Sequence, residues 1–209
     1  MSIAGRKKKE LPLSILFVIA MLVSTVGLIS CSNPKSGSSD APKEYKTTTG
    51  KTIIISETHP TGQSLSNIEI ITKDFEYNYP EIYPGRDPIS EVFVTDLDDN
   101  GFDEIYIITT SAGSGSYGTV LGFASNKDKS LSMVNLPGIQ EGDKNFEGYM
   151  GHDTFKIEDQ KFVRIFPIYD KGDTDNHPTG GTRKLVYGLY PGEAMWQLKV
   201  EKSETFNAP

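Results

Sequence analysis

The chain has 209 residues and a formal net charge of −7, with 21 Lys and Arg residues against 28 Asp and Glu residues. This acidic balance argues against nucleic-acid binding, which depends on clusters of Lys and Arg that face phosphate, and it favours a cationic protein as partner. Cys31 is the only cysteine, so the chain cannot form a disulfide within itself.

Residues 1–30 have the pattern of an export signal. A basic segment at residues 6–9 precedes an apolar stretch at residues 11–28. Residues 28–31, Leu-Ile-Ser-Cys, resemble the lipobox at which bacterial lipoproteins are cleaved and acylated, which implies a lipid on Cys31. The alternative is an uncleaved anchor helix, because the apolar stretch is long enough to span a bilayer. Both interpretations place the rest of the chain outside the cytoplasm.

Residues 31–50 are rich in Ser, Pro, Gly and Lys, a composition typical of a flexible tether. A tether of this length reaches roughly 25 Å, enough to hold a small domain clear of a membrane. Ser32 follows the cysteine, which in a Gram-negative host resembles sorting to the outer membrane. We therefore expect a lipoprotein that faces the periplasm or the cell surface. Without residues 1–30 the chain keeps 17 basic and 27 acidic residues, a net charge of −10.

Residues 51–203 predict a single β-rich domain, and residues 204–209 predict a disordered tail. Short runs rich in β-branched and aromatic residues alternate with polar turns, the pattern of an antiparallel β-sandwich or a curled antiparallel sheet. The fold class is therefore mostly β, preceded by a cleaved signal helix and a disordered tether. The predicted strands are residues 52–56, 67–72, 91–95, 104–110, 119–125, 132–136, 154–158, 162–167, 184–190 and 195–201.

A polar turn between two of these strands carries oxygen ligands at alternate positions. They are Asp96, Asp98 and Asn100, with Glu104 four residues further on. Alternate residues around a tight turn can converge on one Ca²⁺ ion, which takes six to eight oxygen ligands, and the spacing resembles the calcium loops of FG-GAP-type propeller blades. The alternative is an acidic hairpin turn whose Asp side chains bond to the local backbone. Structural calcium is the only cofactor that the sequence suggests.

A loop of small residues, SAGSGSY, follows the next predicted strand. Glycine in a strand or helix interior loses much conformational entropy on folding, so this composition indicates a loop at the tip of a rigid hairpin. The acidic turn, the apolar strand and the sequence Ser114, Gly115, Ser116 and Tyr117 together resemble the periplasmic inhibitors of invertebrate-type (i-type) lysozyme. The resemblance covers residues 52–136, and it leaves the role of residues 137–203 open.

The resemblance implies a non-enzymatic protein whose Ser-Gly-x-Tyr loop enters the active cleft of a lysozyme, and it is compatible with a homodimer. The partner-binding residues would then be Ser114, Gly115, Ser116 and Tyr117. A second hypothesis is a calcium-stabilised surface module that binds glycan or protein without catalysis. Aromatic residues that would line a sugar groove, but that more often pack within a sheet, are Tyr77, Tyr79, Tyr83 and Trp196.

Three enzymatic interpretations are weaker. The glycine spacing from residue 113 to residue 118 matches a dinucleotide fingerprint, but a strand-like segment follows where the pyrophosphate requires a helix. A serine hydrolase needs a base near Ser114 or Ser116, and nothing in the sequence places one of the three histidines there. Paired carboxylates for glycoside hydrolysis need a cleft that the sequence does not reveal.

A metal site on a later loop, from Asp170, Asp173, Asp175 and His177, is less favoured than the alternative that these side chains simply face solvent.

Overall fold

The computed structural model describes residues 37–78 and 80–207, which lie within one compact unit. The predicted signal segment and Cys31 fall outside the described residues. The described residues form strands and one 3-10 turn, with no α-helix among them. Within residues 37–78 and 80–207, no helix has the length and apolar character needed to cross a membrane.

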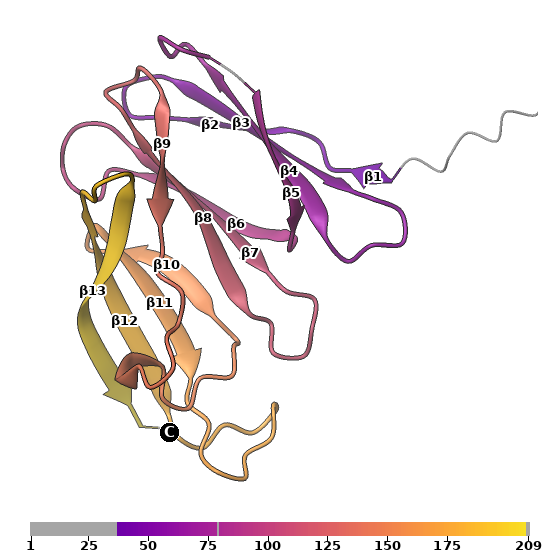
Figure 1. The fold of residues 1–209 in the computed structure, drawn as a ribbon, viewed down its shortest axis with the longest axis vertical. Coiled ribbons are helices and arrows are strands. Elements are labelled where there is room, and N and C mark those ends of the chain that lie inside the picture. Colours follow the sequence, from indigo (N-terminus) through magenta and orange to yellow (C-terminus); the bar gives the residue numbers. More distant parts are fainter. Residues whose placement is uncertain (1–36, 79, 208–209) are drawn as a thin grey trace, which may run out of the picture. The chain divides into compact units, whose positions relative to one another are not determined.

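The strands form two sheets (Figure 1). The first has the order β1-β3-β4-β5, and β2 also pairs with β3; the bounds are β1 Ser38–Ser39, β2 Lys43–Lys46, β3 Thr52–His59, β4 Ser66–Lys73 and β5 Pro80–Arg86. The second has the order β10-β11-β12-β13-β9-β8-β7-β6; the bounds are β6 Ile89–Thr95, β7 Glu104–Thr110, β8 Gly118–Ser125, β9 Leu131–Asn135, β10 Thr154–Glu158, β11 Lys161–Pro167, β12 Thr182–Tyr190 and β13 Trp196–Phe206.

The predicted fold class, mostly β with antiparallel packed or curled sheets, is confirmed. Every pair of neighbouring strands is antiparallel except β13 and β9, which run parallel through Trp196↔Val134 and Gln197↔Asn135. The parallel pair arises because the strand that follows β9 in sequence is not its neighbour in the sheet. The chain first forms β10, β11 and β12, and only then β13, which lies beside β9. Figure 1 shows the orange and yellow strands β10–β13 as the continuation of the magenta strands β6–β8.

Two boundary predictions are wrong. Part of the expected tether is ordered, because Lys43–Lys46 pairs with Thr52–Ile55 in register and Ser38–Ser39 pairs with the end of β3. The expected disordered tail also fails at residues 204–206, which pair with β12 as the last part of β13. Both segments are mostly polar, with Tyr45 and Phe206 as isolated aromatic residues, so they lack the apolar pattern that identifies a strand.

Strand β7 is buried on both faces and organises the core. Ile105 and Ile107 point to the first sheet, where they pack with Ile53, Ile68 and other side chains of β3 and β4. On the opposite face, Tyr106 and Ile108 pack with side chains of β10–β13, because the second sheet curls over itself. The two members of this opposite cluster with the largest fully buried side chains beyond β7 are Phe162 and Phe166. A strand fixed from both sides gives the turns at its two ends a rigid base.

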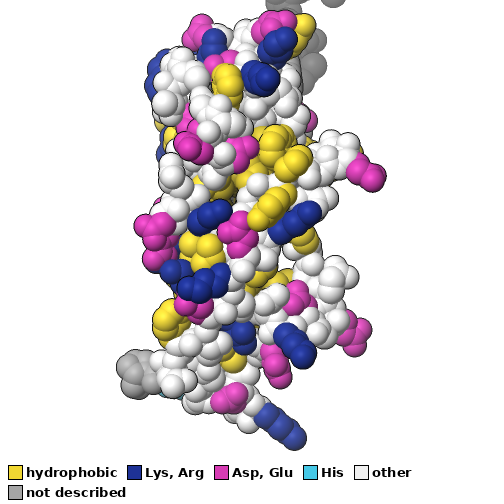
Figure 2. All heavy atoms as spheres, turned by 90° about the vertical axis from the view of Figure 1, so that its left-hand side faces the viewer, with side chains coloured by type: hydrophobic (Ala, Val, Ile, Leu, Met, Phe, Trp, Pro, Cys, Tyr) yellow, Lys and Arg dark blue, Asp and Glu magenta, His cyan; other side chains and the backbone are white. Residues whose placement is uncertain are grey.

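The side of the domain that carries β9 and β13 mixes acidic and basic side chains around hydrophobic ones (Figure 2). The mixture has a local cause in ion pairs among β10–β13. Lys161–Glu201 and Lys184–Glu158 each join strands that are two apart in the sheet, and Lys202–Glu204 lies within β13. Exposed pairs of this kind contribute little to stability. This side therefore offers both signs of charge rather than a field of one sign.

Candidate functional site

The loop Ser111–Tyr117 between β7 and β8 is a closed turn. The Ser111 amide donates to the Tyr117 carbonyl at 2.9 Å, and the Tyr117 amide donates to the Ser111 hydroxyl at 2.9 Å. Within the loop, the Ser116 amide donates to the Gly113 carbonyl at 3.0 Å, and Ser116 has a φ of 41°. Ser114 is exposed at the tip, and Tyr117 is 46% exposed at the stem. The predicted loop is confirmed as a loop, with its tip in solvent.

The middle of the loop contacts a segment that is remote in sequence. The His152 amide donates to the Gly115 carbonyl at 2.6 Å. A Cβ atom on Gly115 would lie 2.4 Å from the Tyr117 ring and 3.1 Å from the Met150 carbonyl oxygen, and a Cβ on Gly151 would lie 2.0 Å from the Gly115 carbonyl oxygen. Both glycines are therefore required by this close backbone approach.

A buried polar cluster supports the stem of the loop. The Asp153 carboxylate accepts hydrogen bonds from the Gly118 amide at 2.8 Å, from the Tyr149 hydroxyl at 2.6 Å and from Arg164 Nε at 2.7 Å. The Arg164 guanidinium also donates to the Tyr149 hydroxyl at 2.7 Å. The Asp153 and Arg164 side chains are 0% and 4% exposed. The first residue of β8 is therefore fixed by a charged group rather than by the sheet alone.

The surroundings keep Arg164 charged and Tyr149 protonated. Burial disfavours the charged form of Arg164, but the hydrogen bond and charge of Asp153 outweigh it and raise the Arg164 pKa. Burial, followed by the hydrogen bond to Asp153, raises the pKa of the Tyr149 hydroxyl. The Arg164 guanidinium carbon lies 5.0 Å from the ring centres of both Phe146 and Tyr149. Such contacts between a cation and an aromatic ring are favourable when water is excluded.

Tyr117 is the exposed end of a chain of aromatic contacts. Its ring packs edge-to-face on Tyr149 with centroids 5.7 Å apart, and Tyr149 packs edge-to-face on the buried Phe166 at 4.9 Å. Beside Tyr117 lies a cavity of about 420 Å³, which is bounded by Tyr149, Arg164, the start of β8 and residues 136–139. Contact with Tyr149 thus orients the Tyr117 ring, while the rest of the ring stays in solvent.

His152 lies next to the loop, although nothing in the sequence places a histidine there. It has a φ of 56°, and its ring centre lies 6.2 Å from that of Tyr169. Its Nε2 atom is buried and has no hydrogen-bond partner among the described residues. None of the hydrogen bonds within the described part of the chain joins this imidazole to Ser114 or Ser116, so a serine–histidine pair is not assembled here.

The acidic turn brings together three of its four predicted ligands. Oxygens of Asp96, Asp98 and Glu104 lie within 4.8 Å of one another. The side-chain oxygen of the fourth, Asn100, accepts the Phe102 amide at 2.8 Å. Asp96 accepts two amides of the turn itself, from Asn100 and from Gly101. Asp96 and Asn100 therefore bond to the local backbone, as expected for an acidic hairpin turn.

Glu104 is the unusual member of the turn. It is fully buried, and its Oε2 accepts the Leu97 amide at 2.8 Å. Its Oε1 and the Oδ1 of Asp98 are also buried, and neither has a hydrogen-bond partner among the described residues. Burial, with the charges of Asp98, Asp96 and Asp103 adding to it, raises the pKa of Glu104 to about 8. An unsatisfied buried polar group costs about 1–3 kcal/mol, and a charged one costs more. Two carboxylate oxygens of the turn are therefore buried at a cost that no partner among the described residues offsets.

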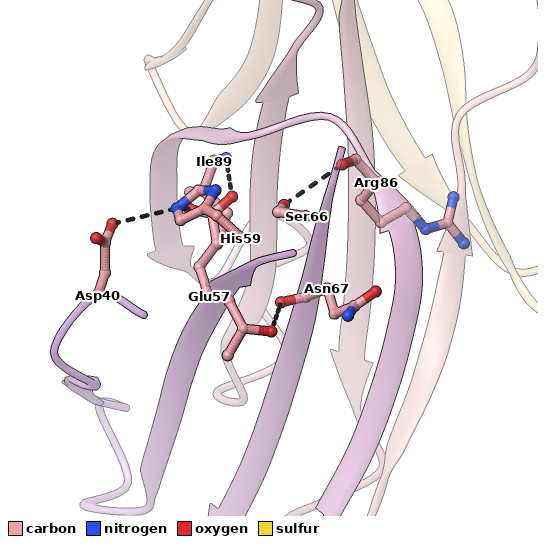
Figure 3. A network of polar contacts seen from close by, with 8 residues as sticks. Asp40, Glu57, His59, Ser66, Asn67, Arg86 and Ile89 are labelled. Carbon is pink, nitrogen blue, oxygen red and sulfur yellow. Dashed lines mark hydrogen bonds and ion pairs between the residues drawn. The ribbon is translucent and has the colours of Figure 1, made fainter. Parts of the chain in front are cut away.

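A second group of ligand-type side chains lies on the first sheet (Figure 3). His59 Nε2 lies 3.9 Å from Asp40 Oδ2 and 4.0 Å from Glu57 Oε2. Sequence reasoning missed this group, because Asp40 falls in the predicted tether. Glu57 already has a structural role, since its Oε1 accepts the Ile89 amide at 3.0 Å and so connects β3 to the first residue of β6.

The remaining predicted groups are not assembled. Tyr83 packs against Phe123 in the core between the sheets, whereas Trp196 packs against the other core cluster. The four polar residues of the later loop do not form a cluster of metal-ligand atoms among the described residues. Instead, Asp173 accepts the amides of Asp170 and Thr179 at 2.7 Å each, which lowers its pKa and shapes the loop.

Comparisons of the chain with protein-family models, with curated proteins and with solved structures give no match. The Ser111–Tyr117 loop, by its geometry and by the resemblance of its residues, is therefore the candidate site.

Proposed function

We propose that the protein is a non-enzymatic inhibitor of lysozyme, of the i-type by resemblance, and that the exposed loop with Ser114 and Tyr117 enters the lysozyme cleft. The observation that carries the proposal is an exposed tip on a braced stem. The loop closes on itself, contacts His152 at its middle and is held by Asp153 at its end. A loop already fixed in one conformation loses little entropy on binding, which raises affinity.

The chemistry of the loop suits a cleft that contains carboxyl groups. Glycoside hydrolases of this kind act through two carboxyl groups that flank the sugar bond. The hydroxyls of Ser114 and Tyr117 are hydrogen-bond donors in solvent, and hydrogen bonds to charged groups contribute about 1.5–3 kcal/mol each. The ring of Tyr117 supplies an amphipathic surface of the size of a sugar subsite. The net charge of −10 beyond residue 30 favours encounter with a cationic partner.

The test measures lysis of a peptidoglycan suspension by i-type and other lysozymes, in the presence of the full-length protein purified in detergent. Inhibition of at least one lysozyme supports the proposal. Tyr117→Ala should relieve the inhibition, whereas Tyr77→Ala, which removes a ring that is 60% exposed outside the loop, should not. Inhibition that survives the Tyr117→Ala change would place the contact surface elsewhere.

The alternative class is a calcium-stabilised surface module that binds glycan or another protein. A pull-down separates the two proposals, with the full-length protein offered immobilised i-type lysozyme in one arm and insoluble peptidoglycan in the other. Retention on peptidoglycan alone would favour the module. Retention on lysozyme alone, lost in Tyr117→Ala, would favour the inhibitor.

A further inference from the structure

We propose that the turn between β6 and β7 binds one calcium ion through Asp96, Asp98 and Glu104, and that the ion stabilises the junction between the two sheets. This site lies at the opposite end of β7 from the Ser111–Tyr117 loop, about 20 Å away along a seven-residue strand. It is independent of the proposed lysozyme contact, and either proposal can fail without the other.

Two carboxylate oxygens of the turn are buried and lack a partner among the described residues. Glu104 is 0% exposed, and within residues 37–78 and 80–207 neither its Oε1 nor the buried Oδ1 of Asp98 has a hydrogen-bond partner. Buried carboxylates in proteins are paired, hydrogen-bonded or bound to a metal. The ion pairs of residues 37–78 and 80–207 involve neither of these carboxylates nor Asp96. A cation between the three side chains would satisfy both orphaned oxygens at once.

The three side chains of the turn determine which kind of cation it would bind. All three are carboxylate oxygens, with no sulfur or nitrogen among them, which favours a hard cation. Calcium binds oxygen at about 2.4 Å, so oxygens on opposite sides of one ion lie up to about 4.8 Å apart, and the three oxygens here fall within that limit. Magnesium binds at about 2.0–2.1 Å and demands a tighter octahedron. The exposed side of the turn, at Asp99 and Asn100, leaves room for water ligands.

Asp103 connects the acidic turn to the first sheet. Asp103 precedes Glu104, and its carboxylate accepts the Thr48 amide and, at 3.1 Å, the Thr48 hydroxyl. Thr48 lies in the turn between β2 and β3 of the first sheet. A cation that fixes Glu104 therefore also fixes the neighbouring side chain that attaches this turn. Calcium should order residues 47–51 as well as the acidic turn itself.

The experiment uses the full-length protein in detergent, freed of metal by chelation and then titrated with Ca²⁺ or Mg²⁺ alone. We expect millimolar Ca²⁺ to raise Tm by about 5 °C or more, and Mg²⁺ to have a smaller effect. Terbium provides a direct readout, because a lanthanide that takes the calcium position would lie near the buried Tyr106 and emit on excitation of tyrosine. Calcium should displace the terbium and quench this emission.

Matched variants decide where the ion binds. Asp98→Asn and Glu104→Gln should weaken calcium binding at least 30-fold. Asp99→Asn, at the neighbouring exposed residue with a φ of 58°, should stay within twofold of the wild type. His59→Ala tests the group on the first sheet and should leave the calcium response intact. Loss of the response in His59→Ala but not in Asp98→Asn would overturn the assignment.

Hydrogen exchange tests the junction. Added calcium should slow amide exchange in residues 47–51 and 96–104, with no equal change at residues 169–183. A wild-type protein whose Tm and terbium emission ignore calcium would overturn the metal site. Calcium binding that leaves exchange at residues 47–51 unchanged would overturn the role at the sheet junction.

Discussion

Arg164 Nε lies 2.7 Å from Asp153 Oδ1, and both side chains are almost completely buried beneath the exposed loop. The free energy of a buried ion pair does not by itself explain its presence, because replacing such pairs by apolar residues is often neutral or stabilising. The other groups that the pair positions must also be considered. Here Asp153 holds the Gly118 amide and the Tyr149 hydroxyl in addition to Arg164. The pair thus determines where the loop enters β8.

Asp153→Ala should destabilise the protein by about 3–5 kcal/mol, because it leaves the Arg164 charge buried and unpaired. The measurement is the urea midpoint of the full-length protein. The double variant Asp153→Ala, Arg164→Met should be less destabilised than the sum of the single changes. Glu158→Ala, which breaks the partly exposed pairs with Lys156 and Lys184, is the control and should change the midpoint much less. Equal midpoints for Asp153→Ala and Glu158→Ala would contradict the structural role of the buried pair.

Tyr117→Ala should weaken lysozyme binding by roughly 30-fold or more. Burial of a large apolar side chain contributes about 1.5–3 kcal/mol, and each 1.4 kcal/mol is a factor of ten in affinity. Ser114→Ala should weaken binding less, and the double variant should fall short of the sum because both residues belong to one loop. Calorimetry with the inhibited lysozyme measures all three. Full affinity in the folded variants would show that other residues make the contact.

Gly115→Ala should weaken inhibition without removing any group that touches the partner. The new methyl carbon would lie 2.4 Å from the Tyr117 ring, so the ring must move from its place on Tyr149. Gly113→Ala is the matched control, because a Cβ there meets nothing within 4 Å. Inhibition assays and Tm should separate the two variants. Identical behaviour of both would mean that the position of the ring is unimportant.

Cys31→Ser should abolish membrane association of the mature chain, because the sequence predicts a lipid on this cysteine. Detergent partitioning and intact-mass spectrometry measure the effect. The wild-type protein should carry a diacylglyceryl mass on Cys31 and lack residues 1–30. An unmodified thiol in the wild-type protein would contradict the predicted lipobox.

The strands were predictable where side chains alternate or where an apolar run is bounded by turns, as in β3, β7 and β11. Strand β5 was missed because its sequence contains Pro80, Pro84 and Gly85, which weaken a strand assignment. Such residues are tolerated because β5 lies at the edge of the first sheet. Strand β2 was missed because three of its four residues are charged and only Tyr45 packs against the core, so that pairing with β3 is what makes the segment a strand.

The candidate site was predictable as a loop but not as a supported loop. Ser114 and Tyr117 stand out in sequence because small residues surround them. The contacts of the neighbouring Gly115 with His152 and of Gly118 with Asp153 join segments about 35 residues apart, and no local pattern encodes which remote segment a curled sheet brings back. The acidic turn was read more fully, because its ligands are close in sequence. Only the inward position of Glu104 and the backbone contact of Asn100 required the structure.

The bracing of the Ser111–Tyr117 loop has a consequence for its resistance to proteolysis. Exposed loop tips with small residues are the usual sites of proteolytic cleavage. A protease acts on such a tip only when the segment can open locally and leave its native contacts. This loop is tied at both stems and at Gly115, so opening it requires the loss of several hydrogen bonds together. The same contacts that orient Tyr117 should therefore protect an exposed, glycine-rich segment from proteolytic cleavage.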